Sequence, residues 1–385
     1  MLRILMTTDT VGGVWDYSLE LAGALVRHGM TVDLAALGPP PDADRRVRAA
    51  ASGVGLHALD CRLEWMRGCA DDLARSGDWL IGLERRTGPD VVHVNGFAHA
   101  ALPFDAPVLA VAHSCVLSWW RHVHGTDAPA EWDGYARRVA EGLTAADLVA
   151  APTRAMLTAA EAEYGPVPHG RVIWNGRRRG HFRPAPKEPL VAGVGRVWDT
   201  AKNLAALDAA APCIDWPVVV AGELTHPEGG PDGGKAGLDH VRCLGAVAPD
   251  RVADLLGRAS IFALPARYEP FGLCVLEAAM SGCALVLGDI ASLRELWDGA
   301  AVFVPPDDSK ALGRALARLT GDAALRGMLA RAAEQRSRLF TTERMADGYL
   351  CAYADVADAP YAGRRFASAH AAAAAPAALS SSLHR

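Results

Sequence analysis

Two carboxylates flank a proline–glycine turn in the second half of the chain. Glu269 begins the string Glu-Pro-Phe-Gly-Leu, and Glu277 follows eight positions later, inside an apolar run. Proline cannot extend a helix backward and glycine lets the backbone come close to a ligand, so we expect a helix to start after the turn with free amides that attract anions. Glu269 would precede this helix and Glu277 would lie within it. The two acids could then hold different hydroxyl groups of one polyhydroxylated, anionic ligand.

Two permanent cations are predicted to lie beside the same cleft. Arg196 closes the string Gly-Val-Gly-Arg at the end of an expected strand, and Lys202 begins the helix that follows. Ligands of open parallel sheets bind at the carboxyl ends of the strands, so both cations fall where a diphosphate could be held. Arginine offers a bidentate fork and lysine a point charge. Without the Glu269 turn, solvated surface charges would be the simpler interpretation.

The first half of the chain places three further residues after expected strands. Gly12 and Gly13 follow the first strand, and His113 ends the strand expected at 108–112. Taken alone, the glycine pair indicates a tight turn and the histidine a structural residue. Their position at strand ends makes them candidates for ligand contact.

The string Glu-Pro-Phe-Gly-Leu-x-Val-Leu-Glu-Ala, followed by Ser-Gly-Cys at 281–283, resembles the signature of the family 4 retaining glycosyltransferases, which have the GT-B fold. The alternative interpretation is a surface helix with two solvated acids. The resemblance extends from the first glycine pair to about Gln335 and is closer in the second half. It fails at Arg177 and Arg178, where the family has Val and Asp. The arginines at 177–179 could meet an anionic acceptor or a lipid headgroup, but we interpret them as an exposed, solvated cluster.

The resemblance implies a role for each candidate position. Glu277 would hold the ribose of a nucleotide, Glu269 and the backbone from Phe271 to Leu273 would hold the transferred sugar, and the cations would hold the diphosphate. The expected catalytic residues are His113, Arg196, Lys202 and Glu269. The expected donor-binding residues are Gly12, Gly13, Arg196, Lys202, Glu269, Pro270, Phe271, Gly272, Leu273 and Glu277.

The resemblance also implies the class of reaction and its partners. A hexose would pass, with retention, from a nucleotide-diphosphate sugar such as a UDP- or GDP-sugar to a carbohydrate, lipid or small-molecule acceptor, without metal or other cofactor. The residues expected to border the acceptor are Trp15, Asp16 and Trp119. The indoles of the two tryptophans could stack on its sugar rings. No nucleophile stands out, which favours front-face displacement. A nucleotide-sugar 2-epimerase and a catalytically silent sugar-nucleotide-binding subunit are the alternatives.

The elements that must position these residues follow an α/β pattern that occurs twice. Short apolar runs alternate with longer amphipathic segments, which predicts two doubly wound, Rossmann-like domains that face each other across a cleft, as in the GT-B fold. We expect an acceptor-binding domain at 1–183 and a nucleotide-sugar-binding domain at 184–340. A helix at 341–358 would cross back to the first domain, and the Ala- and Ser-rich tail at 359–385 is expected to be flexible.

Composition fits a two-domain enzyme and argues against other classes. The 385 residues are 51% hydrophobic, and the net charge of −5 argues against a nucleic-acid-binding surface. The eight cysteines show neither a C-x-x-C pair nor metal spacing, so we expect buried thiols in a reducing compartment and no metal site. The sequence lacks a run of about 18 apolar residues. We therefore expect a cytoplasmic protein of unspecified oligomeric state, with peripheral membrane contact left open.

Overall fold

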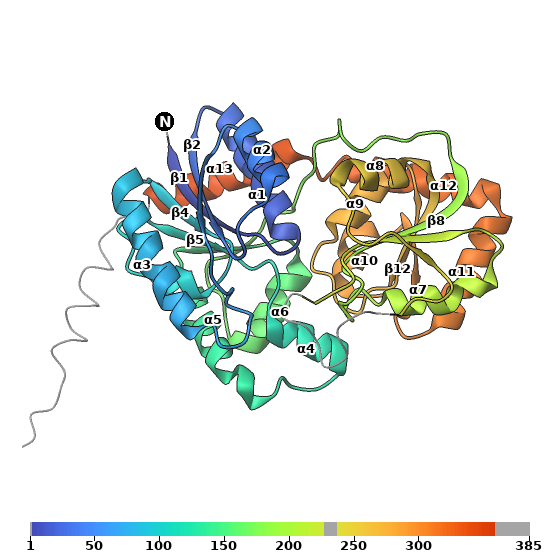
Figure 1. The fold of residues 1–385 in the computed structure, drawn as a ribbon, viewed down its shortest axis with the longest axis horizontal. Coiled ribbons are helices and arrows are strands. Elements are labelled where there is room, and N and C mark those ends of the chain that lie inside the picture. The colour runs from blue at the N-terminus through green and yellow to red at the C-terminus, as the bar shows by residue number, and fades with distance from the viewer. Residues whose placement is uncertain (1, 227–236, 359–385) are drawn as a thin grey trace, which may run out of the picture.

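The computed structural model describes residues 2–226 and 237–358, which form two α/β lobes side by side (Figure 1). Each lobe is a parallel sheet with helices on both faces. The predicted fold class, two doubly wound Rossmann-like domains, is confirmed. The expectation for the tail at 359–385 lies outside the described residues.

The first lobe contains a seven-stranded parallel sheet in the order β3-β2-β1-β4-β5-β6-β7. Its strands are β1 (Arg3–Asp9), β2 (Thr31–Leu37), β3 (Gly55–Leu59), β4 (Val91–Val94), β5 (Val108–Val111), β6 (Leu148–Ala151) and β7 (Gly170–Val172). Its helices are α1 (Gly13–Arg27), α2 (Ala43–Ala51), α3 (Ala70–Thr87), α4 (Val116–His124), α5 (Asp133–Ala145) and α6 (Arg154–Tyr164).

Helices cover both faces of this sheet, which explains why its strands read as nearly continuous apolar runs. Along β1, Leu5 belongs to the core under α3 and α5, whereas Ile4 and Met6 belong to the core under α1. The sequence pattern missed β7, because this edge strand is three residues long and only half-buried.

The second lobe contains a six-stranded parallel sheet in the order β10-β9-β8-β11-β12-β13. Its strands are β8 (Glu188–Val194), β9 (Val218–Ala221), β10 (Arg242–Cys243), β11 (Ala259–Leu264), β12 (Ala284–Gly288) and β13 (Ala301–Val304). Its helices are α7 (Leu204–Ala210), α8 (Pro249–Arg258), α9 (Leu273–Met280), α10 (Ala291–Trp297), α11 (Ser309–Gly321) and α12 (Ala323–Ser337).

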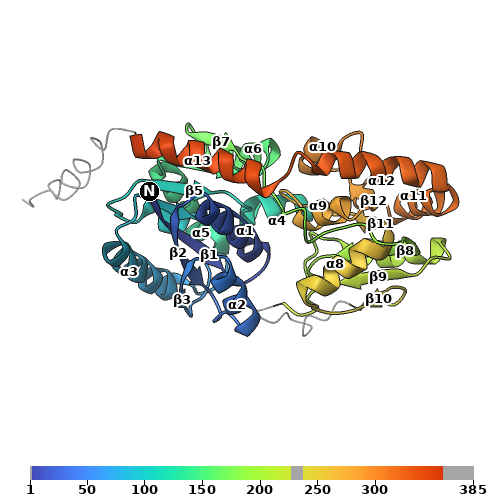
Figure 2. The same ribbon diagram turned by 90° about the horizontal axis from the view of Figure 1, so that it is seen from above.

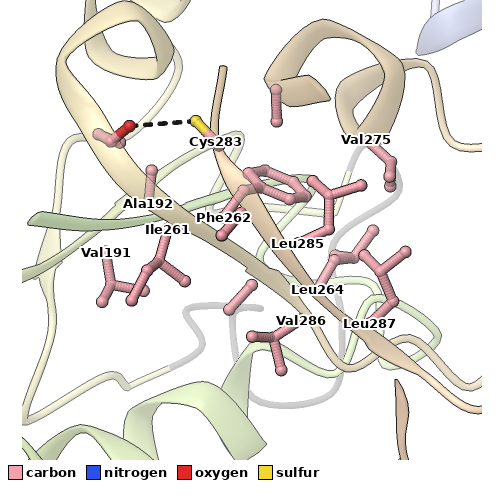
Figure 3. Packing of buried hydrophobic residues seen from close by; sticks show 14 of the residues in the cluster. Val191, Ala192, Ile261, Phe262, Leu264, Val275, Cys283, Leu285, Val286 and Leu287 are labelled. Carbon is pink, nitrogen blue, oxygen red and sulfur yellow. Dashed lines mark hydrogen bonds between the residues drawn. The ribbon is translucent and has the colours of Figure 1, made fainter. Parts of the chain in front are cut away.

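The core of the second lobe is built around the neighbouring strands β11 and β12. Phe262 is the register partner of Leu285, and Leu264 is the partner of Leu287, so these four side chains share one face of the sheet. Figure 3 shows them packed there, with Ile261 and Val286 on the opposite side. This rigid sheet carries the loops that hold the second-lobe site residues.

Helix α13 (Thr342–Asp358) leaves the second lobe and packs on the first, beside α1 (Figure 2). Its buried face contributes Met345, Tyr349 and Tyr353 to the first-lobe core. The Tyr353 hydroxyl lies 2.7 Å from Nδ1 of His93, a fully buried ring whose pKa is lowered to about 4 by burial. The neutral His93 can therefore accept a hydrogen bond from the tyrosine, which ties α13 to β4.

Replacing Tyr353 by Phe is expected to lower the free energy of unfolding by about 1–2 kcal/mol, because Nδ1 of His93 would be left buried without its donor. Urea unfolding, followed by circular dichroism, measures the change. The control is Glu343→Gln on the exposed face of the same helix, which should leave the midpoint unchanged. Equal midpoints for Tyr353→Phe and the control would contradict this account.

Candidate active site

A cleft of about 1370 Å³ separates the two lobes at the carboxyl ends of their strands. Both lobes contribute to its walls. The structure brings together there all the residues that the sequence predicted for the donor and for catalysis: Gly12, Gly13, His113, Arg196, Lys202, Glu269, Pro270, Phe271, Gly272, Leu273 and Glu277.

The turn after β11 opens helix α9 directly into this cleft. Gly272 is the N-cap residue of α9 and has φ +81°, a left-handed conformation that favours glycine. No side chain caps this N-terminus among the described residues, so its amides remain available. The Ser292 hydroxyl donates to the Glu269 carbonyl at 2.6 Å, and the Thr153 hydroxyl donates to that of Pro270 at 2.9 Å. The turn is therefore fixed from both lobes.

Lys202 and Glu269 form an ion pair inside the cleft. Nζ of Lys202 donates to Oε2 of Glu269 at 2.6 Å, and Glu269 is only 8% exposed. Burial disfavours the ammonium, but Glu269 and Asp199 outweigh it and raise the pKa of Lys202, so the cation is retained at neutral pH. Asn203 sets the backbone here: it has φ +55°, and its amide donates to two proline carbonyls.

Arg196 is held by a second buried acid. Its Nη2 donates to Oδ2 of Asp199 at 2.7 Å, and its guanidinium lies 4.9 Å from the ring centre of Trp198. Oδ1 of Asp199 accepts from the Trp119 indole at 3.2 Å and from the Ala201 amide at 3.0 Å. Burial opposes the carboxylate, yet Arg196 and Lys202 hold the pKa of Asp199 below its usual value. The indole of α4 thus reaches across the cleft to the second lobe.

The glycine loop after β1 faces these cations from the first lobe. Gly12 has φ +102°, and a Cβ at this position would lie 3.1 Å from Nη1 of Arg196. A Cβ at Gly13 would lie 3.9 Å from the Leu273 side chain. Helix α1 starts at Gly13 without a side-chain cap, as α9 does. Two uncapped helix N-termini therefore face one another across the cleft, a geometry suited to an anion.

His113 lies after β5, where it is oriented by Asn95 and Tyr17. Its Nε2 is 2.8 Å from Oδ1 of Asn95, and the Tyr17 ring packs edge-on at 4.5 Å between centres. Burial, together with His93, lowers the pKa of His113 to about 3. The ring is neutral at physiological pH, and with Nε2 donating to Asn95, its Nδ1 carries a lone pair that can accept from a hydroxyl group.

Asp9 is a cleft residue that the sequence analysis missed. It ends β1, and its Oδ1 accepts from the Val11 amide at 2.9 Å. Burial raises the pKa of Asp9 to about 7, even though Arg196 opposes the shift. Its place at the carboxyl end of a central strand is the signal that could have identified it.

Two expectations need correction. Arg177 is not part of a solvated cluster: it is 8% exposed and pairs with Glu277, while Arg178 and Arg179 are exposed. Trp15 was expected at the acceptor, but its side chain is 1% exposed in the first-lobe core and is not part of the cleft wall. It packs in the cluster that includes Met6 of β1 and Ala49 of α2, and the guanidinium of Arg45 lies 5.8 Å from its ring centre. Asp16 and Trp119 do line the cleft.

The described residues, 2–226 and 237–358, contain no group of three or more His, Cys, Asp or Glu side chains arranged to hold a metal ion. None of their helices combines the length and apolar character needed to cross a membrane.

Two family models match successive parts of the chain. The model described as Glycosyltransferase Family 4 matches residues 11–178, and the model described as Glycosyl transferases group 1 matches residues 188–322. Together they cover most of the chain, including both walls of the cleft. This chain belongs to the family 4 glycosyltransferases. The recognition made from the Glu269 signature is confirmed.

Relatives of this glycosyltransferase cover it to different extents. It is 27% identical to the glycogen synthase of Mycobacterium tuberculosis over 87% of this chain and 90% of that protein. It is 34% identical to the D-inositol 3-phosphate glycosyltransferase of Salinispora tropica, over 30% of this chain but only 25% of that protein. The chain is therefore a glycosyltransferase in the broad sense.

Solved structures with the same architecture confirm the GT-B fold of this glycosyltransferase. Sucrose-phosphate synthase from Thermosynechococcus elongatus superposes with a TM-score of 0.75 at 20% identity, over 92% of this chain and 99% of that one. Anabaena HepE, solved in complex with UDP and glucose, superposes with a TM-score of 0.74 at 17% identity, over 92% and 100% of the two chains.

Replacing Asp9 by Asn is expected to raise the free energy of unfolding at pH 8 by about 1 kcal/mol or more. The pKa of Asp9 rises from 3.8 to about 7 on folding, so the folded state keeps a proton that the unfolded state releases, and wild-type stability falls as the pH rises between these values. Asparagine removes this loss and keeps an acceptor for the Val11 amide.

Urea unfolding at pH 4, 6 and 8 measures the Asp9 effect. The gain should be largest at pH 8 and should shrink toward pH 4. Asp347→Asn, on the exposed face of α13, is the matched control and should show no such trend. A difference between Asp9→Asn and wild type that is the same at all three pH values would contradict the raised pKa.

Proposed function

We propose that this glycosyltransferase moves a hexose, with retention and without a metal ion, from a nucleotide-diphosphate sugar to an acceptor held by the first lobe. One observation carries the proposal. Arg196, Lys202 and the uncapped N-termini of α1 and α9 converge on one cleft from both lobes. This arrangement supplies fixed positive charge for a diphosphate, the role that a divalent cation fills elsewhere.

The charge would act mainly on the leaving group. As the bond between the sugar C1 and the phosphate oxygen breaks, negative charge grows on that oxygen. Cations that are already oriented, Arg196 by Asp199 and Lys202 by Glu269, stabilise this state more than the ground state. The nucleoside diphosphate then departs.

The remaining residues are arranged for the sugar and the nucleotide. Glu269 and the backbone from Phe271 to Leu273 would hold sugar hydroxyls beside α9, and the lone pair of His113 would accept from another hydroxyl. Glu277, one turn into α9, would take the ribose. Asp16 and Trp119 border the first-lobe part of the cleft, where the acceptor would lie.

Front-face displacement fits the contacts of Asp199 and Glu269, the two carboxylates paired with Arg196 and Lys202. Both oxygens of Asp199 accept hydrogen bonds, and Oε2 of Glu269 is held by Lys202, which leaves Oε1 of Glu269 for the sugar hydroxyl assigned to this residue. In this mechanism, the acceptor oxygen bonds to C1 on the face that the phosphate leaves. The proton of the acceptor hydroxyl passes to the leaving phosphate oxygen. A covalent sugar adduct on Glu269 or Asp199, trapped and detected by mass spectrometry, would overturn this step.

The comparisons support a sugar-nucleotide donor but leave its base and sugar open. HepE, which shares the fold, was solved with UDP-glucose as well as with UDP and glucose. Relatives named as synthases of glycogen and of mannosylfructose phosphate are transferases that join sugars. An epimerase would use the donor site alone and would have no need of the first-lobe wall formed by Asp16 and Trp119.

A panel of UDP-, GDP- and ADP-sugars tests the proposal directly. Slow release of the nucleoside diphosphate from one donor is expected, with water standing in for the acceptor, and neither Mg²⁺ nor EDTA should change the rate by more than about twofold. Loss of release in EDTA would contradict metal independence. Conversion of the donor to its 2-epimer would favour the epimerase.

Replacing Lys202 by Met is expected to lower the rate of donor hydrolysis by about 100- to 1000-fold, because one fixed cation beside the leaving phosphate is lost. Lys310→Met on the exposed surface of the second lobe is the matched control and should retain the wild-type rate. Comparable rates for Lys202→Met and wild type would place the diphosphate elsewhere.

Replacing Glu269 by Gln separates the enzyme from a silent binding subunit. We expect turnover to fall by at least about 100-fold while the affinity for the nucleoside diphosphate changes by less than about threefold, since Glu269 is assigned to the transferred sugar. Calorimetry with the nucleoside diphosphate gives the affinity, and a hydrolysis assay with the nucleotide sugar gives the turnover rate. If wild type binds a nucleotide sugar but never turns it over, the silent subunit would be supported.

A further inference from the structure

Arg177 occupies the segment that connects the two lobes. It lies between β7 and β8, where its amide donates to the Phe340 carbonyl at 3.2 Å and its backbone forms a bridge with Thr341, just before α13. The side chain is buried between α1 of the first lobe and α9 of the second. Its backbone is therefore fixed while its guanidinium faces both lobes.

On the second-lobe side, the guanidinium binds one oxygen of Glu277. Nε donates to Oε1 at 2.8 Å, and Nη2 lies 2.5 Å from the same atom. Glu277 is 6% exposed and lines the cleft. The contacts of Arg177 with this carboxylate all fall on Oε1, which sets the orientation of the carboxylate as a whole.

On the first-lobe side, two acids of α1 approach the same guanidinium at longer range. Nη2 lies 3.9 Å from Oδ2 of Asp16, and Nη1 lies 3.7 Å from Oε1 of Glu20, both beyond hydrogen-bond distance. Asp16 is also paired with Arg48, and Glu20 accepts from the Thr342 hydroxyl at 2.9 Å. The three acids therefore depend on Arg177 and Arg48 for their charge balance.

We propose that Arg177 is a positioning residue for the ribose of the nucleotide: it fixes Oε1 of Glu277, so that Oε2 can accept hydrogen bonds from the ribose hydroxyls. The inference rests on the proposed function, in which Glu277 takes the ribose. It assigns a recognition role to a residue that the sequence alone placed in a solvated cluster.

The alternative is that Arg177 only ties the lobes together. The electrostatics of Glu277 indicate that Arg177 also positions its carboxylate. Burial raises the pKa of Glu277, Asp16 and Glu20 push it the same way, and Arg177 opposes them. Without the guanidinium, the carboxylate would rotate away from its neighbouring acids or take up a proton, and in either state it would accept more weakly from the ribose. Discrimination of the ribose should therefore suffer beyond any loss of stability.

Calorimetry with paired ribo and 2′-deoxy ligands tests this role. The probes are UDP against 2′-deoxy-UDP, GDP against 2′-deoxy-GDP and ADP against 2′-deoxy-ADP. Wild type should prefer the ribo form of its nucleotide by about tenfold or more, as expected for a hydrogen bond to a charged group. In Arg177→Gln, the preference should fall below about threefold. Arg179→Gln removes a charge two positions away, at an exposed residue outside the cleft, and should keep the wild-type preference.

A double-mutant cycle separates positioning from a merely structural effect. Glu277→Gln should reduce the ribo preference by itself, and Arg177→Gln combined with Glu277→Gln should reduce it no further, because Arg177 acts through Glu277. Thermal melting checks that each variant is folded. If Arg177→Gln does not fold, Arg177→Lys replaces it: lysine keeps the charge but cannot place two donors on one oxygen, and should lower the preference at least threefold.

The outcomes distinguish this inference from the function on which it rests. If wild type binds none of the three nucleoside diphosphates, the proposed function fails and this inference fails with it. If wild type binds one of them without preferring its ribo form, the ribose role of Glu277 and this inference are overturned, but the proposed sugar transfer is not. It is likewise overturned if Arg177→Gln keeps the wild-type preference, or if the two single effects add in the double variant.

Discussion

The charges in the cleft must be paired, and the rest of the site depends on that constraint. A charge removed from water is costly unless an opposite charge and hydrogen bonds compensate it. Three cations of the cleft therefore hold carboxylates, in the pairs Lys202 with Glu269, Arg196 with Asp199, and Arg177 with Glu277. These pairs orient the groups before a ligand arrives, so little reorganisation is left for the binding step.

Hydrogen bonds between the lobes connect the site to their spacing. The Trp119 indole of the first lobe donates to Asp199 of the second, and the Tyr268 hydroxyl lies 2.9 Å from that of Ser118. Glu295 of α10 accepts from two amides at the start of α6. Any opening or closing of the cleft would have to remake these hydrogen bonds, so the geometry of the site and the arrangement of the lobes are mechanically linked.

The N-termini of α1 and α9 differ from those of the other helices in the residue that precedes them. Asp or Thr side chains cap α2, α6, α11 and α12, whereas α3, α5, α7, α8 and α10 have no side-chain cap. Helices α1 and α9 also lack a side-chain cap, but both start after a glycine with positive φ, and both open into the cleft. The glycine N-cap, which has no side chain to fill the space before the helix, is what lets the backbone amides of these two helices face the ligand space.

Much of the fold was predictable because a parallel sheet covered on both faces leaves a strong one-dimensional signal. The strand expected at 108–112, for example, is β5 at Val108–Val111. The exception is β7, whose three half-buried residues leave no apolar run. The helix start after Glu269 was equally predictable, because the effects of proline and glycine on the backbone are confined to neighbouring residues.

The sequence by itself therefore determined the fold class, the family and the strand-end residues that line the cleft, since these follow from local periodicity and from short strings of fixed spacing. Only the tertiary structure decided which charges meet. Arg177 pairs with Glu277 across 100 positions of the chain, and Trp15 turns into the core rather than the cleft. Such pairings depend on the packing of separate elements and of two lobes, and distances between elements are not encoded in the spacing of residues along the chain.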